Sequence, residues 1–323
     1  MIKVVFDTNF YREFVRNKNY NEVELAILKL KKLEFEHGFL PYLSVHVSCE
    51  LLKHLKDEKG RDFYSCKKAI RAQYLHCSLK SQNHQFKVQI FTIPFKLDAI
   101  YQFWGQGYGI ADTNFQKDII LLIKALHELK QKSILDSLSG CFDEIQELFE
   151  SYRKIIISEM GVELLDNFNI ESIPDLINSL RNDILLREKY FKLLNGVEFD
   201  DFITRAYFQA LDEVIDKTSI DCQLPVNAFD IFKETIKPSI EFIRKFYLGI
   251  ASGLTQDNQK ILTNDKSKRW NSMIDNEIIF DTVLANAILV TNEIGIIGAY
   301  EKSNRRAQVY SSNEYFKAIN YID

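Results

Sequence analysis

Acidic residues occupy four separate places where predicted strands end or predicted helices begin. They are Asp7, Glu50, Asp275 and Glu293. Carboxylates that lie close together repel each other, and each raises the pKa of its neighbours unless a cation is present. Mg²⁺ and Mn²⁺ bind carboxylate oxygens and water, and in phosphodiester cleavage they activate water and stabilise the leaving oxygen. We therefore expect these four side chains to bind Mg²⁺ or Mn²⁺ and to serve hydrolysis.

Two of the acids belong to short segments with the same pattern, in which apolar residues are followed by small polar residues and an acid. VVFDTN places Asp7 after a predicted strand over residues 2–6, and AILVTNE places Glu293 after a predicted strand over 287–290. Ligands of open parallel sheets bind outside the carboxyl ends of the strands. A turn residue or a helix cap would explain the polar residues at either place equally well, so neither segment is decisive alone.

The other two acids lie on predicted helices. Glu50 falls within the apolar-leaning stripe of its helix, so it either lies at the edge of that stripe or faces a polar pocket. Asp275 lies in the first turns of a helix over 271–284, where an acid also favours the positive end of the helix dipole. Glu277 and Asp281 lie on the same helix, so the pattern alone does not single out Asp275.

The elements that must position these acids have an α/β pattern at both ends of the chain. Strands are predicted over 2–6, 39–43, 287–290 and 308–310, and helices over 22–36, 45–55, 271–284 and 313–319. This alternation is typical of a parallel sheet. Helical patterns dominate the middle of the sequence. We predict an α/β domain in two parts, 1–113 and 255–323, with a mostly helical insertion over 114–254.

The composition limits the class of protein. Hydrophobic residues make up 46% and charged residues 27% of the 323, which suits a folded chain of two domains or one enlarged domain. The net charge of −4 means that any basic surface for a polyanion must be local. Five cysteines without ligand spacing are typical of reduced thiols in the cytoplasm. We expect no signal peptide and no membrane span.

The ordered set of motifs resembles the PIN-domain nucleases. That family opens with an apolar strand that ends in Asp, often followed by Thr-Asn, which VVFDTN matches. It has a Glu on the helix after the second strand, matched by SVHVSCELLKHL, and a later Asp-bearing helix and strand, matched by SMIDNEIIFDTVLANAILVTNE. The last acid here is Glu293, where the family usually has Asp. The helical insertion lies outside the minimal family domain.

The resemblance implies a three-layer α/β/α fold with a parallel central sheet, and metal-dependent endonucleolytic cleavage of RNA, single-stranded RNA being the better expectation. The four acids would bind Mg²⁺ or Mn²⁺. Supporting hydrogen bonds to the ligands or to a phosphate are expected from Asn9, Thr291 and Asn292. A basic rim would hold the polyanion, and its candidates are Lys266, Lys268, Arg269, Arg305 and Arg306.

Three other functions stay open on the sequence. The first is a structure-specific DNA nuclease, and the second is a catalytically inactive PIN-like scaffold that binds protein or RNA. The third is a phosphatase resembling haloacid dehalogenases, which would need a second Asp where this chain has Asn9. An inhibitory or regulatory protein partner, a homo-oligomer and the number of metal ions are also left open.

Overall fold

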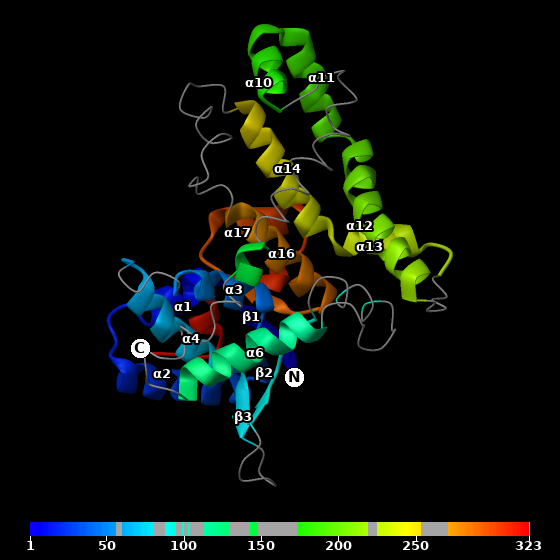
Figure 1. The fold of residues 1–323 in the computed structure, drawn as a ribbon. Coiled ribbons are helices and arrows are strands. Elements are labelled where there is room, and N and C mark those ends of the chain that lie inside the picture. Colours follow the sequence, from blue (N-terminus) through cyan, green and yellow to red (C-terminus); the bar gives the residue numbers. More distant parts are fainter. Residues whose placement is uncertain are drawn as a thin grey trace. The chain divides into compact units, whose positions relative to one another are not determined.

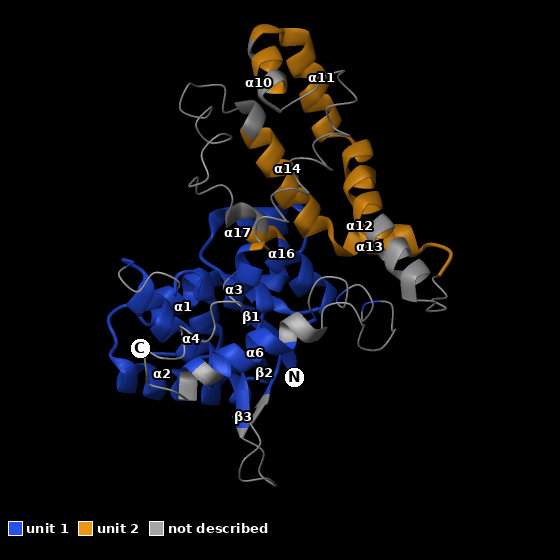
Figure 2. Ribbon diagram, viewed as in Figure 1, with its two compact units in different colours: residues 1–146, 277–323 blue, residues 147–276 orange. Residues whose placement is uncertain are grey.

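The chain forms two compact units, which are coloured separately in Figure 2. The computed structural model describes residues 1–55, 60–80, 88–94, 113–128, 143–147, 173–218, 225–252 and 271–322, together with residues 99 and 103. Unit 1 comprises residues 1–146 and 277–323, and unit 2 comprises residues 147–276. The two ends of the chain therefore build one unit, and the middle of the chain builds the other.

The observed division differs from the predicted boundaries at 113/114 and 254/255. Helix α6 (Thr113–Glu128) belongs to unit 1, where it contacts α3 (Val45–Lys53) and α4 (Phe63–Cys77). Its helical pattern alone suggested the insertion, but its contacts assign it to the α/β unit. At the other boundary, α16 (Asn271–Leu284) begins in unit 2 and ends in unit 1.

Unit 1 is a mixed α/β unit built on a parallel sheet of four described strands in the order β2-β1-β5-β6. The strands are β1 (Ile2–Phe6), β2 (Phe39–Tyr42), β5 (Ile288–Val290) and β6 (Val309–Tyr310). Each lies where the sequence predicts it, to within two residues. The order confirms the parallel sheet and makes neighbours of β1 and β5, which come from opposite ends of the chain.

The helices of unit 1 begin at polar caps, because the first turn of a helix leaves its N–H groups without backbone partners. Asn19 and Glu22 form a capping box at the start of α2 (Tyr20–Glu36), and Ser311 and Glu314 form another at α18 (Ser312–Ala318). Gly38 follows α2 with a φ of 80°, a conformation that suits glycine. The unit also contains α1 (Thr8–Phe14), α17 (Ile294–Lys302), a 3-10 turn (Arg306–Gln308) and the hairpin strands β3 (Ser78–Lys80) and β4 (Val88–Ile90).

Aromatic side chains join the sheet to helices α1, α4 and α18, the first two of which are labelled in Figure 1. The ring of Phe6 lies 4.5 Å from that of Phe10, 4.7 Å from that of His76 and 5.3 Å from that of Tyr315, centroid to centroid. A buried polar chain crosses the same core. His76 Nε2 lies 2.7 Å from Glu34 Oε2, and the Tyr315 hydroxyl donates to Glu34 Oε1 at 3.0 Å. These contacts anchor the elements that surround the carboxyl end of β1.

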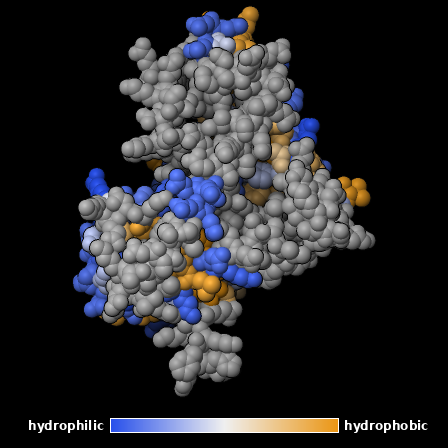
Figure 3. Space-filling view, in the orientation of Figure 1, coloured by the Kyte–Doolittle hydropathy of each residue, from blue (hydrophilic) through white to orange (hydrophobic). Residues whose placement is uncertain are grey.

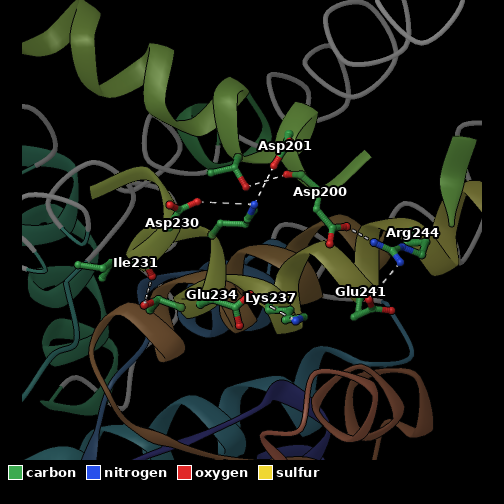
Figure 4. Close-up of polar contacts among 11 residues, drawn as sticks. Asp200, Asp201, Asp230, Ile231, Glu234, Lys237, Glu241 and Arg244 are labelled. Atoms are coloured by element: carbon green, nitrogen blue, oxygen red, sulfur yellow. Dashed lines mark hydrogen bonds and ion pairs between the residues drawn. The ribbon is translucent and has the colours of Figure 1, made fainter. Parts of the chain in front are cut away.

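Unit 2 is helical in its described residues. Its helices are α10 (Ile173–Asn182), α11 (Ile184–Leu194), α12 (Val197–Thr218), α13 (Ala228–Thr235), α14 (Lys237–Ser252) and the start of α16. Ion pairs tie α12 to α13 and α14 (Figure 4). Arg244 binds Asp200 and lies 3.2 Å from Glu241, and Lys233 lies 2.9 Å from Asp201.

Within the described ranges, no helix combines the length and apolar character that crossing a membrane requires.

Candidate functional site

The carboxyl ends of β1 and β5 lie side by side in unit 1. Phe6 pairs with Val290, and the N–H of Asp7 continues the ladder by donating to the Val290 carbonyl at 3.1 Å. The next residue of β5, Thr291, donates its hydroxyl to Oδ2 of Asp7. The two segments that the sequence singled out for their shared form are therefore hydrogen-bonded to each other.

Asp7 is also the N-cap of α1, so the helix-cap explanation left open by the sequence holds for this residue. Its Oδ1 accepts from the N–H of Phe10 at 2.7 Å. An ordinary capping carboxylate is exposed and is stabilised in its charged form. Asp7 is instead only 3% exposed, which makes its charge costly. Capping alone therefore does not account for an acid at this position.

Glu50 is buried beside the start of α1. It lies on α3, is 9% exposed, and its Oε2 accepts a hydrogen bond of 2.5 Å from the Thr8 hydroxyl. Glu50 is therefore buried and hydrogen-bonded rather than exposed at the edge of the apolar stripe of its helix. The sequence analysis did not single out Thr8, because it expected no helix directly after Asp7. Thr8 is the first residue of α1, and from there its hydroxyl reaches Glu50 on α3.

Neighbouring negative charges affect the ionisation of Asp7. Burial is the largest cause that raises its pKa to about 7, and the charges of Glu50 and Glu13 raise it further. Hydrogen bonds from Thr291 and from the Phe10 N–H act in the opposite direction. No positive side chain is among these causes. The causes that raise the pKa of Asp7 are therefore its burial and two neighbouring negative charges.

The donor set fits part of a magnesium or manganese site. Mg²⁺ usually keeps several waters and takes one or two protein carboxylates, and Asp7 and Glu50 supply two carboxylates with hard oxygen donors. Among the residues that the structure describes, however, no three or more His, Cys, Asp or Glu side chains form a group that could hold a metal ion. Further ligands would have to come from water, from substrate phosphate or from the other predicted acids.

Glu293 and Asn292 follow Thr291 at the end of β5. The N–H of Glu293 donates to the Thr291 hydroxyl at 3.0 Å, and its exposed side chain makes no capping bond at the start of α17. Asn292 donates to Glu13 Oε2 at 2.8 Å and accepts from the N–H of Ser312 at 3.0 Å. Asn292 therefore connects α1 to α18 and holds Glu13, an acid near Asp7 that the sequence analysis did not single out.

Asn9 and the acids of α16 have to be considered separately. Asn9 is exposed on α1, and no hydrogen bond joins its side chain to Asp7 or Glu50 in the described structure. Asp275 belongs to unit 2 and stays a predicted ligand. Further along α16, the buried Asp281 binds His46 of α3, with 2.8 Å between Oδ2 and Nδ1. Asp281, one of the alternatives on that helix, thus takes part in a buried pair that holds α16 against α3.

The predicted basic rim is described only in part. Lys266, Lys268 and Arg269 lie outside the described residues. Arg306 binds Glu314 at 2.6 Å and Glu301 at 3.2 Å, so a phosphate would compete with two carboxylates for its guanidinium. Arg305 donates to Gln308 at 3.2 Å. The described surface in Figure 3 mixes hydrophilic and apolar side chains.

Comparisons of the chain with protein-family models, with curated proteins and with solved structures find no match.

Proposed function

We propose that the protein is a metal-dependent nuclease of the PIN-like class that cleaves RNA internally by hydrolysing phosphodiester bonds. One observation carries the proposal: Asp7 and Glu50 are both buried, and Glu50 is hydrogen-bonded to Thr8, the residue that follows Asp7. The parallel order of β1 and β5 supports the resemblance of the motifs to that family. A three-layer α/β/α arrangement and a cytoplasmic location belong to the same proposal.

The residues of the chain have distinct roles in this proposal. The Phe10 N–H and the Thr291 hydroxyl each bind one oxygen of Asp7 and favour its charged form. Glu50 uses Oε2 to accept from Thr8, which leaves Oε1 as its oxygen for a cation. Glu293 would add a ligand within unit 1, and Asp275 stays a ligand implied by the resemblance alone. When bound, Mg²⁺ or Mn²⁺ would lower the pKa of an attacking water and stabilise the charge on the leaving oxygen.

Single-stranded RNA is the proposed substrate, because its flexible backbone can reach acids that lie in a recessed position. A structure-specific DNA nuclease would use the same carboxylate chemistry, so substrate class has to be settled by assay. The basic residues that would hold the backbone remain predictions.

The direct test is a cleavage assay with labelled single-stranded RNA, single-stranded DNA and branched DNA in the presence of Mn²⁺. We expect the wild-type protein to cleave RNA, and Asp7→Asn and Glu50→Gln to abolish cleavage. Glu36→Gln is the matched control, because Glu36 is an exposed carboxylate at the end of α2. It should cleave as the wild type does.

Other outcomes would separate the alternatives. Equal cleavage by wild type and Asp7→Asn would contradict the role of Asp7. Cleavage of branched DNA alone would indicate the DNA nuclease. A phosphoryl group trapped on Asp7 would indicate a phosphatase. Absence of both cleavage and Mn²⁺ binding would favour the inactive scaffold.

A further inference from the structure

The hydrogen bond between Thr8 and Glu50 joins two elements at the candidate site. Thr8 is the first residue of α1, and Glu50 lies 42 residues further along the chain on α3. Both side chains are buried, with Thr8 3% and Glu50 9% exposed. The bond therefore lies in a place where an unsatisfied carboxylate oxygen would be costly.

Glu50 is held next to the residue that follows Asp7, since its carboxylate is hydrogen-bonded to Thr8, and two carboxylates in such a position repel each other when both are charged. A glutamate side chain has several rotatable torsions, and turning toward solvent would relieve both the repulsion and the cost of burial. Threonine is stiff at its first side-chain torsion, so the buried hydroxyl of Thr8 offers the carboxylate a donor with a fixed direction. Because this donor binds Oε2, the second oxygen of Glu50 stays available.

We propose that Thr8 is a positioning residue for Glu50, and that its hydroxyl orients the Glu50 carboxylate for a divalent cation shared with Asp7. The inference rests on the proposed function. It gives the two adjacent residues complementary roles: Asp7 supplies one ligand, and Thr8 aligns the other. Thr291 acts in the same way on Asp7 from the neighbouring strand.

Mn²⁺ binding measured by titration calorimetry tests this role without reference to catalysis. Thr8→Val keeps the shape of the side chain and removes the hydroxyl. We expect it to weaken Mn²⁺ binding roughly 10- to 100-fold, the usual effect of losing a hydrogen bond to a metal ligand. Thr8→Ser keeps a hydroxyl and should retain most of the affinity. Thr204→Val is the matched control, because Thr204 is a buried threonine of unit 2 whose hydroxyl binds the Asp200 carbonyl at 2.7 Å.

A second measurement separates positioning from general damage to the fold. In a Glu50→Gln background, Thr8→Val should cause little further loss of Mn²⁺ affinity, because its effect acts through Glu50. Circular dichroism of each variant reports whether it is folded. If Thr8→Val does not fold, Thr8→Ala is titrated instead, with the same loss expected.

The outcomes distinguish this inference from the function on which it rests. If the wild type binds Mn²⁺ and the folded Thr8→Val binds it equally well, the positioning role is refuted and the proposed function stands. An equal loss of affinity in the wild-type and Glu50→Gln backgrounds would also refute it. If the wild type binds no Mn²⁺, both the proposed function and this inference fail.

Discussion

Replacing Asp7 by asparagine should make the metal-free protein more stable above neutral pH, although it removes a proposed ligand. The pKa of Asp7 is about 7 in the folded chain and 3.8 in its ordinary environment. Between these values the folded state holds a proton that the unfolded state has released, so the free energy of unfolding falls as the pH rises. The full difference of 7 − 3.8 corresponds to about 4 kcal/mol at 1.36 kcal/mol per pH unit.

Asparagine cannot ionise, so the free energy of unfolding of the variant does not fall in this way as the pH rises. Its amide oxygen can still accept from Phe10, but its NH₂ group forces the Thr291 hydroxyl to turn, which costs about 1 kcal/mol. We therefore expect Asp7→Asn to raise the free energy of unfolding at pH 8 by about 3 kcal/mol. Near pH 4 the gain should disappear, because Asp7 is then protonated in the folded wild type.

Urea unfolding followed by circular dichroism measures this effect, in EDTA at pH 4, 6 and 8. Glu36→Gln serves as the control and should show no comparable gain. Added Mn²⁺ should stabilise the wild type by about 2.7 kcal/mol at a hundredfold excess over the dissociation constant, and should not stabilise Asp7→Asn. If Asp7→Asn is less stable than wild type at pH 8 in EDTA, the charge of Asp7 is compensated and the reasoning is refuted.

Further predictions concern buried groups of unit 1. His46→Phe should lower the free energy of unfolding by about 3 kcal/mol, because it removes the buried imidazole that binds the Asp281 carboxylate; a loss below about 1 kcal/mol would contradict this. Tyr300→Phe should leave stability unchanged or raise it by up to about 1 kcal/mol, since the buried Tyr300 hydroxyl has no hydrogen-bond partner in the described structure. Tyr315→Phe is its matched comparison and should cost about 2 kcal/mol, because the hydroxyl donates to the buried Glu34 carboxylate. Urea unfolding measures both free energies. Equal changes in the free energy of unfolding for Tyr300→Phe and Tyr315→Phe would contradict the different hydrogen bonding of the two hydroxyl groups.

Much of the sheet could be predicted from the sequence because its signals are local. Runs of apolar, often β-branched residues mark β1 and β5, and Ser44 and Ser311 begin the helices predicted after β2 and β6. Helix α1 was missed, since its seven residues are too few for a clear helical period. The pattern of α6 is the same in either unit, and only its contacts with α3 and α4 place it in unit 1.

The candidate site was predictable only in its residue types. Strand ends marked Asp7 and Thr291, but the hydrogen-bond partner of Glu50 is Thr8, which lies 42 residues away. The pattern also gave no reason to expect Glu13 near Asp7 or to expect Arg306 to bind two carboxylates. Such pairings depend on side chains that meet only after folding.

The adjacency of β1 and β5 has a consequence for biosynthesis. Asp7 and Thr291 are separated by 284 positions, so at about 5–20 residues per second the ribosome needs roughly 15 to 60 s to make the second after the first. During that interval β1 lacks its central partner and Asp7 lacks a hydroxyl donor. A nascent chain therefore cannot form the hydrogen bond between Thr291 and Asp7 until β5 has been synthesised.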